Sequence, residues 1–351
     1  MAAIHGVVTT GIYCVPSCAG RPRRENVRPF ESAAGAEAAG FRACHRCRPY
    51  RAEPPAGAAS ALVCRAVELV AAGALDEGGE AALAARLGVS ARHLRRMFVD
   101  QIGASPDQLA RSRRAHFARR LLDDTDLAVS HVAFAAGFGS LRQFNRQMAF
   151  TFRATPRELR RRRRRADRLV ADGGLALRVP LAEPVDFDRL LRRLAETAVP
   201  GLEALCATRY RRMVTLGPDP GVIEIGEGGR DHVLLIAHLP RLEGLIHVVD
   251  QVRRLVGGRS GYDPYEDAVR AIIARSVGPS AVSLHLSRVV RQYGTPVAGL
   301  QPFGLSHTFP LPAILARADL LAAGLDPTLA QALQDHAAHS EGQATAPSPT
   351  R

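Results

Sequence analysis

The sequence predicts a multidomain protein of 351 residues: a small α/β domain, an all-α domain, an α+β domain and a partial all-α domain. Three observations support this order: two close cysteine pairs near the N-terminus, two helix–turn–helix patterns after them, and a change to mixed strands and helices after residue 174. The length suits two or three domains of ordinary size. Apolar residues make up 46% and charged residues 23%, which excludes collagen, coiled-coil and wholly disordered classes.

Positive charge is concentrated in the first half of the chain. The net charge is +13, and all 47 basic residues are arginine. Residues 1–165 contain 28 arginines and 14 acidic residues, whereas residues 166–351 contain 19 arginines and 20 acidic residues. This asymmetry predicts a polyanion, most simply nucleic acid, as the partner of the first half. Compositional drift toward Arg and Ala is the alternative, and it explains the absence of Lys but not the one-sided balance.

The N-terminal residues give no sign of secretion or membrane insertion. They lack a basic segment followed by a sustained apolar run. No window of about 18 uninterrupted apolar residues occurs. We therefore expect a cytoplasmic, nucleoid-associated protein with reduced thiols and no membrane partner.

Four of the six cysteines form two close pairs. Cys14 and Cys18 are separated by three residues, and Cys44 and Cys47 by two. Two such pairs joined by a loop have the spacing of a four-thiolate site for one Zn²⁺, and a disulfide interpretation is weak in a reducing compartment. The other two, Cys64 and Cys206, lie in apolar contexts that predict plain buried cysteines in helices.

The residues around these pairs extend beyond a generic metal site. The segments are TTGIYCVPSC at residues 9–18, RENV at 24–27 and AGFRACHRC at 39–47. Together they resemble the N-terminal zinc domain of the Ada family, methylphosphotriester-DNA methyltransferases and alkylation-response regulators, over a domain of residues 1–52. The resemblance implies that all four cysteines bind zinc and that Cys14 is also the methyl acceptor. It further implies contacts to the DNA phosphate backbone by Thr10, Arg21, Arg42 and Arg46.

Two alternatives assign these residues no role in methyl transfer or DNA contact. In the first, each arginine is a solvated surface charge instead of a DNA contact. In the second, the cysteine cluster is a zinc site that only stabilises a small domain and accepts no methyl group. The chemistry of methyl transfer is nevertheless reasonable, because a thiolate is the nucleophile and zinc keeps it deprotonated. Zinc with four thiolates has a formal charge of about −2, and methylation of one sulfur changes it to about −1. Repulsion of DNA phosphates then falls, so one irreversible transfer raises DNA affinity.

The middle of the chain contains two helix–turn–helix patterns after a linker at residues 51–58. A helix over 60–72 precedes the first pattern at 81–98, and the second covers 129–150. Each has a small-residue helix, a turn containing Gly and an amphipathic second helix. The segment 106–122, which begins at Pro106, predicts one long helix between them.

This arrangement resembles the AraC-type DNA-binding domain over residues 59–160, with one recognition helix from each unit in adjacent major grooves of double-stranded promoter DNA. The resemblance implies a transcription activator with RNA polymerase as a further partner. Arg, Asn and Gln can read base edges, whereas other contacts go to phosphate. The candidate DNA-binding residues are Arg92, His93, Arg95 and Arg96 on the first recognition helix, and Ser140, Arg142, Gln143, Asn145 and Arg146 on the second. The segment 151–154 (TFRA) departs from the family, which often has Gly there.

Six consecutive arginines at residues 160–165 follow the second pattern. They predict either an electrostatic contact with DNA at the edge of the domain or a solvated linker between domains. The sequence favours neither.

The second half has a different character. Strands are predicted over 176–181, 210–216, 221–225 and 232–239, with a helix over 187–198. With PGLE at 200–203, this α+β pattern resembles the N-terminal domain of AlkA-type 3-methyladenine DNA glycosylases, over residues 174–257. The segments 261–273 and 308–320 resemble the opening of that family's helical domain, here residues 261–338.

The catalytic parts of the glycosylase family have no match in this sequence. No Leu-Pro-Gly-Ile-Gly-like hairpin turn follows residue 261, and Asp319, Asp326 and Asp335 precede the place where it would come. Residues 339–351 predict a disordered polar tail. Because base excision needs a closed pocket for a flipped base, we expect no glycosylase activity.

The leading hypothesis is a single-turnover methyl acceptor and DNA-binding activator of the alkylation-damage response. A zinc and helix–turn–helix regulator without methyl transfer is the second hypothesis. A 3-methyladenine glycosylase, by inheritance from the family, is the third.

Overall fold

The computed structural model describes residues 4–345 apart from residues 21, 52–58, 77, 172, 207 and 218. The chain divides into two compact units, which are described separately. The first comprises Met1–Val170 with Pro180–Glu183 and Leu242–Asp250; the second comprises Ala171–Val179, Pro184–Arg241 and Gln251–Arg351.

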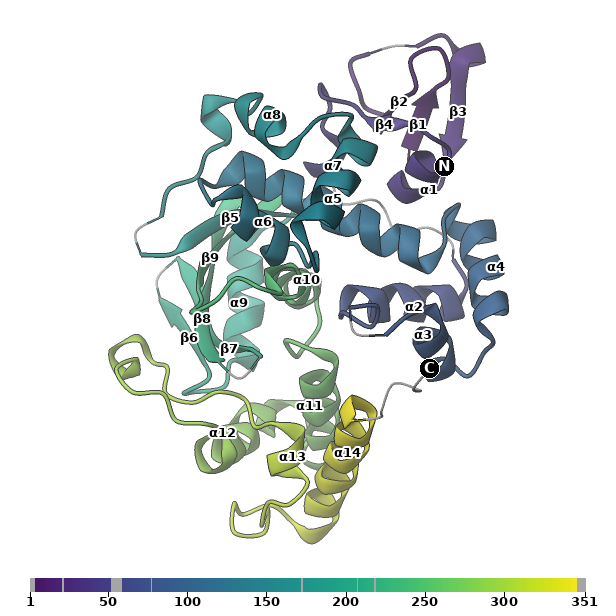
Figure 1. The fold of residues 1–351 in the computed structure, drawn as a ribbon. Coiled ribbons are helices and arrows are strands. Elements are labelled where there is room, and N and C mark those ends of the chain that lie inside the picture. The colour runs from purple at the N-terminus through teal and green to yellow at the C-terminus, as the bar shows by residue number, and fades with distance from the viewer. Residues whose placement is uncertain are drawn as a thin grey trace. The chain divides into compact units, whose positions relative to one another are not determined.

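The first unit begins with a small four-stranded sheet and one helix (Figure 1). Its strands have the order β3-β1-β2-β4, in which β1 is antiparallel to β2 and β3, and β2 is parallel to β4. Gly6 is required on β1, because a Cβ there would lie 2.6 Å from the Phe30 ring. The elements are β1 (Ile4–Val7), β2 (Ile12–Cys14), η1 (Arg24–Asn26), β3 (Val27–Phe30), α1 (Ala33–Ala38), β4 (Arg42–Ala43) and η2 (Pro49–Arg51).

Seven helices follow in the same unit, and all the helices predicted from periodicity are present. Ser90, Ser105, Ser140 and Thr155 each begin a helix by accepting a backbone N–H with the side-chain oxygen. The helices are α2 (Ala61–Ala71), α3 (Glu80–Arg86), α4 (Ala91–Ile102), α5 (Pro106–Asp124), α6 (Val129–Ala135), α7 (Leu141–Phe152) and α8 (Pro156–Arg161). A 3-10 turn, η3 (Arg165–Asp167), comes after them.

The two helix pairs each enclose an apolar core. Leu83 of α3 packs with Leu94 and Phe98 of α4 in the first pair. In the second, Phe138 and Phe144 have ring centroids 5.3 Å apart. These buried side chains recur three and four residues apart, so the opposite faces of α4 and α7 remain exposed.

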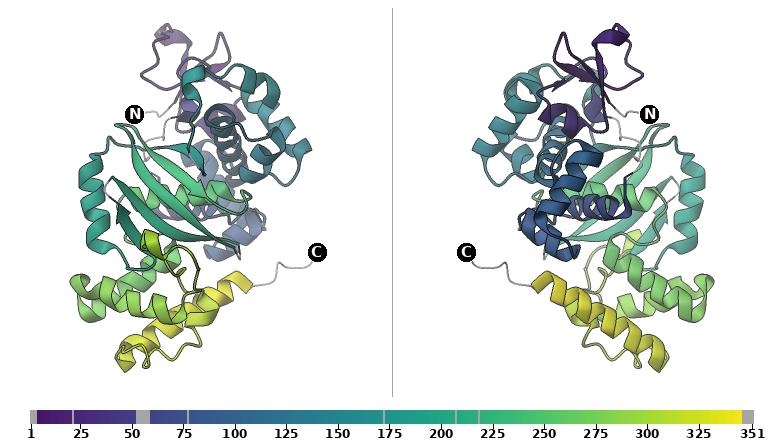
Figure 2. Two further views of the ribbon diagram at one scale, coloured as in Figure 1. Left: turned by 90° about the vertical axis from the view of Figure 1, so that its left-hand side faces the viewer. Right: turned by 90° about the vertical axis from the view of Figure 1, so that its right-hand side faces the viewer.

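The second unit contains a five-stranded sheet of order β5-β9-β8-β7-β6 with α9 against it (Figure 2). Strands β6 to β9 are antiparallel neighbours. The sequence predicted every strand except β6, which is only four residues long and is defined by its pairing with β7. The elements are β5 (Leu175–Pro180), α9 (Phe187–Thr197), β6 (Glu203–Cys206), β7 (Arg209–Leu216), β8 (Asp219–Gly229) and β9 (His232–His238). Helix α10 (Leu245–Val256) follows in the sequence, and its residues 245–250 belong to the first unit.

Residues after 261 fold mainly as helices around an apolar core. Val269, Ile273, Val290 and Leu333 are fully buried in one apolar cluster. Leu202, which immediately precedes β6, belongs to the same cluster, so sheet and helices of this unit share a core. The elements are α11 (Pro264–Val277), η4 (Pro279–Ala281), α12 (Val282–Tyr293), η5 (Gln301–Phe303), α13 (Pro312–Leu315) and α14 (Pro327–Thr345).

A ring of four buried charges joins the sheet to α11 in this unit. Glu203 and Glu266 each contact both Arg212 and Arg270, and each of these side chains is at most 3% exposed. Tyr210 also donates a hydrogen bond to Glu203 at 2.6 Å. Each charge therefore has two partners of opposite sign, which offsets the cost of burial.

Two sequence predictions were wrong at their boundaries. The polar tail does not begin at residue 339, because α14 extends to Thr345; Ala and Gln are good helix formers, and no proline interrupts them before Pro347. Arg51 is not part of a linker either, because it lies in η2 and pairs with Asp123 and Asp124. Residues 52–58 and 346–351 lie outside the described residues.

Among the helices that the structure describes, none combines the length and the apolar character needed to cross a membrane.

Candidate metal centre and nucleic-acid interface

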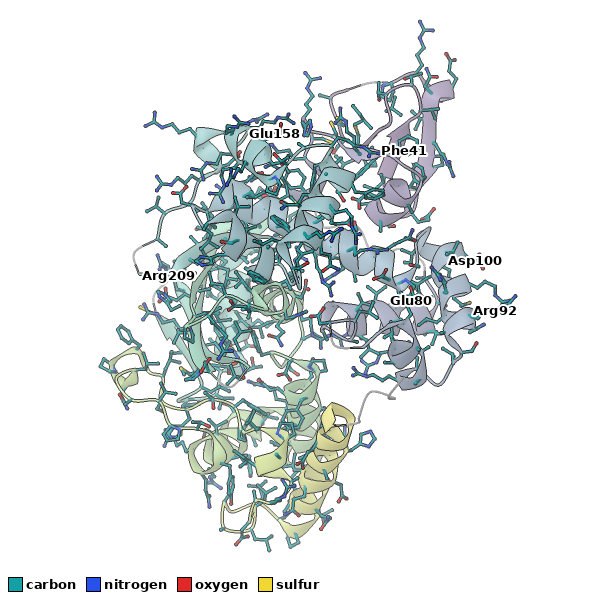
Figure 3. All side chains as sticks on the ribbon, in the orientation of Figure 1. Phe41, Glu80, Arg92, Asp100, Glu158 and Arg209 are labelled. Atoms are coloured by element: carbon teal, nitrogen blue, oxygen red, sulfur yellow. The ribbon has the colours of Figure 1, made fainter. Side chains whose placement is uncertain are left out.

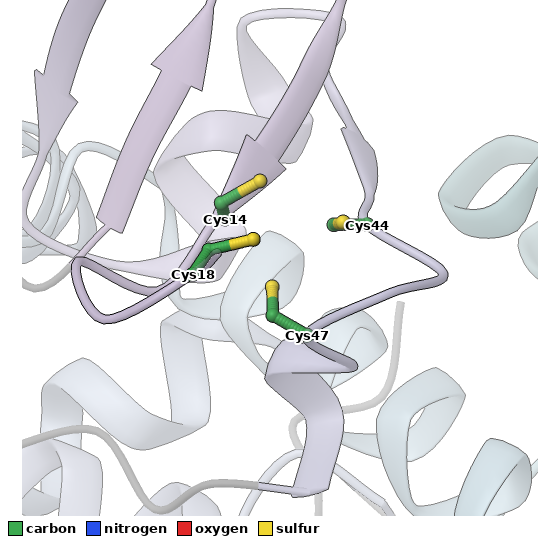
Figure 4. Close-up of side chains that lie close together, drawn as sticks. All are labelled: Cys14, Cys18, Cys44 and Cys47. Carbon is green, nitrogen blue, oxygen red and sulfur yellow. The ribbon is translucent and has the colours of Figure 1, made fainter. Parts of the chain in front are cut away.

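The four paired cysteines converge on one point (Figure 4). Cys14 ends β2, and Cys18 follows a tight turn in which its N–H bonds to the Val15 carbonyl at 3.0 Å. Cys44 follows β4, and its N–H bonds to the Tyr13 carbonyl at 3.0 Å. The four Sγ atoms all lie within 4.8 Å of one another. The parallel pairing of β2 with β4 thus brings the two cysteine pairs together.

This arrangement fits one Zn²⁺. A tetrahedral site with Zn–S bonds of about 2.3 Å places its sulfurs roughly 3.8 Å apart. The thiols also compete for protons: a hydrogen bond between Cys14 and Cys47 raises the pKa of Cys14 and lowers the pKa of Cys47 to about 5. Only a cation that offsets their charge allows all four to be thiolates at once. The site is therefore a zinc centre.

The four sulfurs differ in exposure and in hydrogen bonding. Cys44 is buried, whereas the other three are partly exposed. The backbone N–H of Arg46 bonds to the sulfur of Cys44 at 3.4 Å. The sulfur of Cys14 interacts with the side chains of Cys47 and Cys44. Cys44 is thus the least accessible of the four, and Cys14 is one of the three that are partly exposed.

The residues predicted to contact phosphate in this module differ in exposure and in their hydrogen bonds. Thr10 is exposed in the β1–β2 turn, and its hydroxyl donates to the Val7 carbonyl at 3.4 Å. Arg46 is exposed, and Arg42 is partly buried with a bond to the Ala43 carbonyl at 3.3 Å. Arg21 lies outside the described residues.

On α4, the predicted recognition residues share the exposed face. Arg92, labelled in Figure 3, extends from the helix away from its packed side. Arg96 is exposed and lies 3.2 Å from Nδ1 of the partly buried His93. Arg95 is exposed, and its Nε lies 3.9 Å from Glu80. The acidic side chain partly offsets the positive charge of this arginine.

On α7, the corresponding residues also share one face. Arg142, Asn145 and Arg146 are exposed, and Gln143 is partly exposed. Ser140 has a structural role as well, because its hydroxyl accepts the Gln143 N–H at 3.2 Å and so begins the helix. DNA contact by the residues of α4 and α7 stays a prediction.

The arginine run is neither a free linker nor a uniformly exposed patch. Arg160 donates to the Leu127 carbonyl at 2.8 Å, and Arg163 donates to the Thr125 carbonyl at 2.9 Å and to Asp126 at 2.6 Å. These two side chains hold the loop before α6. A cleft of about 560 Å³ lies beside them, lined by Asp126, Leu127, Ala128, Val129, Arg157, Arg160 and Arg161.

A buried ion-pair cluster was not predicted from the sequence. Asp123 at the end of α5 is fully buried, accepts a hydrogen bond from Tyr50 at 3.0 Å and pairs with Arg119 at 2.9 Å. Arg48, which follows Cys47, pairs with Asp167 at 2.6 Å. The sequence signal was the pair Asp123 and Asp124, directly after the predicted helix at 106–122.

Cys64 lies in a helix, α2, as predicted, but the expected burial of Cys64 and Cys206 and the expected helix at Cys206 were wrong. Both are exposed, and Cys206 lies on the edge strand β6. Apolar neighbours in the sequence do not bury a residue whose own side faces away from the core.

The three aspartates of the helical part have structural partners. Asp319 and Asp326 accept backbone N–H groups at 3.2 and 3.0 Å in turns, and Asp335 accepts the Gln331 amide at 2.7 Å. All three are exposed.

Comparison with known proteins agrees with this organisation. The chain matches the metal-binding domain of Ada over residues 2–50, a helix-turn-helix domain over residues 83–162 and the AlkA N-terminal domain over residues 176–260. It is 37% identical over 350 residues to the probable bifunctional transcriptional activator/DNA repair enzyme AlkA of Mycobacterium tuberculosis, covering 90% of this chain and 70% of that one. It is 32% identical over 160 residues to the bifunctional transcriptional activator/DNA repair enzyme Ada of Escherichia coli, covering 45% of this chain and 44% of that one.

The long match to the mycobacterial protein includes the zinc module, the tandem helix–turn–helix helices and the AlkA-type sheet in the same order. The chain therefore belongs to the Ada/AlkA family of bifunctional transcriptional activators and DNA repair enzymes.

Proposed function

We propose that this chain removes the methyl group from a methylphosphotriester in DNA by transferring it to Cys14, and that the methylated protein then binds promoter DNA as a transcription activator. The observation that carries the proposal is the environment of the Cys14 sulfur. It lies at the end of β2 and is partly exposed, whereas the sulfur of Cys44 is buried and accepts the Arg46 N–H at 3.4 Å. A thiolate that is accessible to the substrate is the better nucleophile.

The transfer balances without any other reactant. An electron pair of the Cys14 thiolate forms the S–C bond to the methyl carbon while the C–O bond breaks in line. The bonding pair returns to the phosphate oxygen, which leaves an ordinary phosphodiester anion. No proton moves. Bound zinc supplies the positive charge that keeps the four sulfurs deprotonated. Because no step reverses the thioether, each chain acts once.

The second part of the proposal follows from charge. Methylation changes the formal charge of the centre by +1, next to a module whose exposed side chains include Arg46. Weaker repulsion of phosphates favours DNA binding, and the effect falls with salt. The exposed faces of α4 and α7 would then lie in major grooves of promoter DNA, where RNA polymerase is the further partner.

The test uses a duplex with one isotopically labelled methylphosphotriester. Intact mass should rise by one methyl group, and peptide mapping should place the label on Cys14. Cys14→Ala should take up none, and the matched control Cys64→Ala, which removes an exposed thiol outside the metal centre, should react as the wild type does. Transfer to Cys14→Ala would overturn the assignment. An unchanged wild-type mass would leave the alternative of a regulator without methyl transfer.

We also propose that this chain does not excise alkylated bases. The supporting observation is that Asp319, Asp326 and Asp335 are exposed and engaged in turns or with a neighbouring side chain. Incubation with DNA containing 3-methyladenine should release no free base. Release by this chain, unaffected by substitution of Cys14, would contradict the proposal.

A further inference from the structure

Helix α1 of the zinc module packs directly on the tandem helix–turn–helix helices. The Ser32 hydroxyl donates to the Ile102 carbonyl at the end of α4, at 2.7 Å. Gly35 permits this approach, because a Cβ there would lie 3.0 Å from the same carbonyl oxygen and 3.3 Å from Gly103 Cα. One end of α1 therefore contacts the first recognition helix.

Glu37, near the other end of α1, is the centre of a buried polar cluster. Its side chain is 3% exposed. Oε1 accepts the Tyr13 hydroxyl at 2.7 Å and lies 2.7 Å from Nε2 of His116 on α5. Oε2 accepts the hydroxyl of Thr151 on α7 at 3.5 Å. Because an ionised carboxylate only accepts, Nε2 of His116 is the donor.

The same cluster reaches the metal ligands. Tyr13 is fully buried and directly precedes Cys14, and its backbone carbonyl accepts the N–H of Cys44 at 3.0 Å. Anchoring Tyr13 thus fixes one ligand from each cysteine pair. On the other side, Thr151 is the penultimate residue of α7, the predicted second recognition helix.

We infer that Glu37 and His116 are positioning residues that hold the zinc ligands and the second recognition helix as one body, so that the state of the metal centre alters the stability of α5 and α7. Its relevance to DNA repair rests on the proposed function. A buried carboxylate with three donors is costly to leave partly satisfied, so the cluster has one favoured arrangement. A change at the ligands therefore displaces the donors on α5 and α7 rather than being absorbed locally.

Hydrogen exchange measured by mass spectrometry on the full chain tests this inference. Removing zinc with a chelator should raise exchange at least about fivefold in α5 and α7, the lower end of typical coupling between sites. Strands β8 and β9 of the second unit provide the internal reference and should not respond. Unchanged exchange in α5 and α7 after chelation would overturn the inference.

Variants then separate the hydrogen bonds from general packing. Glu37→Leu, while still loaded with zinc, should exchange in α5 and α7 at the faster, metal-free rate. Glu37→Gln retains an acceptor for Tyr13 and His116 and a donor for Thr151, so it should restore the zinc response. Glu31→Leu changes an exposed glutamate of the same module and should behave as wild type.

Tyr13→Phe removes the hydroxyl that donates to Glu37 and provides the test if Glu37→Leu does not fold. It should raise exchange in α5 and α7 of the zinc-loaded chain, and wild-type exchange in this variant would then contradict the inference. No methyl donor enters the experiment. Failure of methyl transfer to Cys14 would therefore leave these results unaffected, and failure of the zinc response would leave the Cys14 assignment unaffected.

Discussion

The carboxylate of Glu37 lies 2.7 Å from Nε2 of His116, although 79 residues separate them in the sequence. The first residue belongs to the zinc module and the second to the helix that joins the two helix–turn–helix units. A side chain that is surface-prone by composition is thereby buried at the contact between the module and the helices.

This pair should show a measurable coupling energy. Hydrogen bonds to a charged group contribute about 1.5–3 kcal/mol, so a double-mutant cycle of Glu37→Leu and His116→Leu should give a coupling of that order. Urea denaturation of the zinc-loaded chain provides the four free energies of unfolding. The matched cycle of Glu31→Leu with His116→Leu should be additive, because Glu31 is exposed. Additivity in both cycles would show that the contact contributes nothing.

Loss of the buried carboxylate of Asp123 should strongly lower the free energy of unfolding. Asp123→Ala leaves the charge of Arg119 and the hydroxyl of Tyr50 without their buried partner. Breaking a buried pair in this way costs about 3–5 kcal/mol in the free energy of unfolding. The control Asp100→Ala, at an exposed position on α4, should change it by less than about 0.5 kcal/mol. Equal midpoints of chemical denaturation for the two variants would refute the expectation.

The residues that directly follow α4 and α7 both have a backbone conformation that favours glycine. Both helices end in a left-handed residue, Gly103 with φ of 78° and Arg153 with φ of 52°. A Cβ in this conformation costs about 1–2 kcal/mol. Arg153→Gly should therefore stabilise the chain by roughly 0.5–1 kcal/mol after the loss of its exposed contacts, and Gly103→Ala should destabilise it. Thermal unfolding of both variants checks the signs, and a lower melting temperature for Arg153→Gly would contradict the argument.

The contribution of Glu224 should depend on pH. Burial alone would raise its pKa, but hydrogen bonds and charges of Arg209 and Arg211, at 2.8 and 2.9 Å, outweigh burial and hold its pKa below the ordinary 4.5. A carboxyl group whose pKa is lowered by folding stabilises the folded state above pH 4.5. This stabilisation is lost as the pH falls through the pKa of the group in the folded state. The difference in unfolding free energy between wild type and Glu224→Gln should be constant near neutral pH and shrink below 4.5. A difference in unfolding free energy that grows as the pH falls would contradict this expectation.

Recognition-helix contacts can be sorted by salt dependence once a binding site is known. If Arg92 contacts phosphate, Arg92→Ala should weaken binding to all sequences alike and reduce the slope of log affinity against log salt by about 0.9. If Arg142 reads a base edge, Arg142→Ala should cost about 1–3 kcal/mol only on the cognate site. Fluorescence anisotropy at several salt concentrations, on cognate and scrambled duplexes, distinguishes the two roles for each arginine.

The amino-acid sequence alone determined the modular order and the metal ligands. The ligand spacing, the apolar periodicity and the Ser and Pro helix starts are local patterns, so they predicted Cys14, Cys18, Cys44 and Cys47 and the helices α2 to α7. The short strand β6 was missed because pairing with β7, and not its own four residues, defines it.

Only the tertiary structure decided which polar side chains become buried and with whom. Glu37, His116 and Asp123 look like ordinary surface residues in the sequence, because burial of a charge depends on partners that arrive from distant elements. The same reason explains the exposure of Cys64 and Cys206 and the engagement of Arg160 and Arg163. The local sequence pattern determines which helices and strands form, whereas packing between them determines which charged side chains pair with one another.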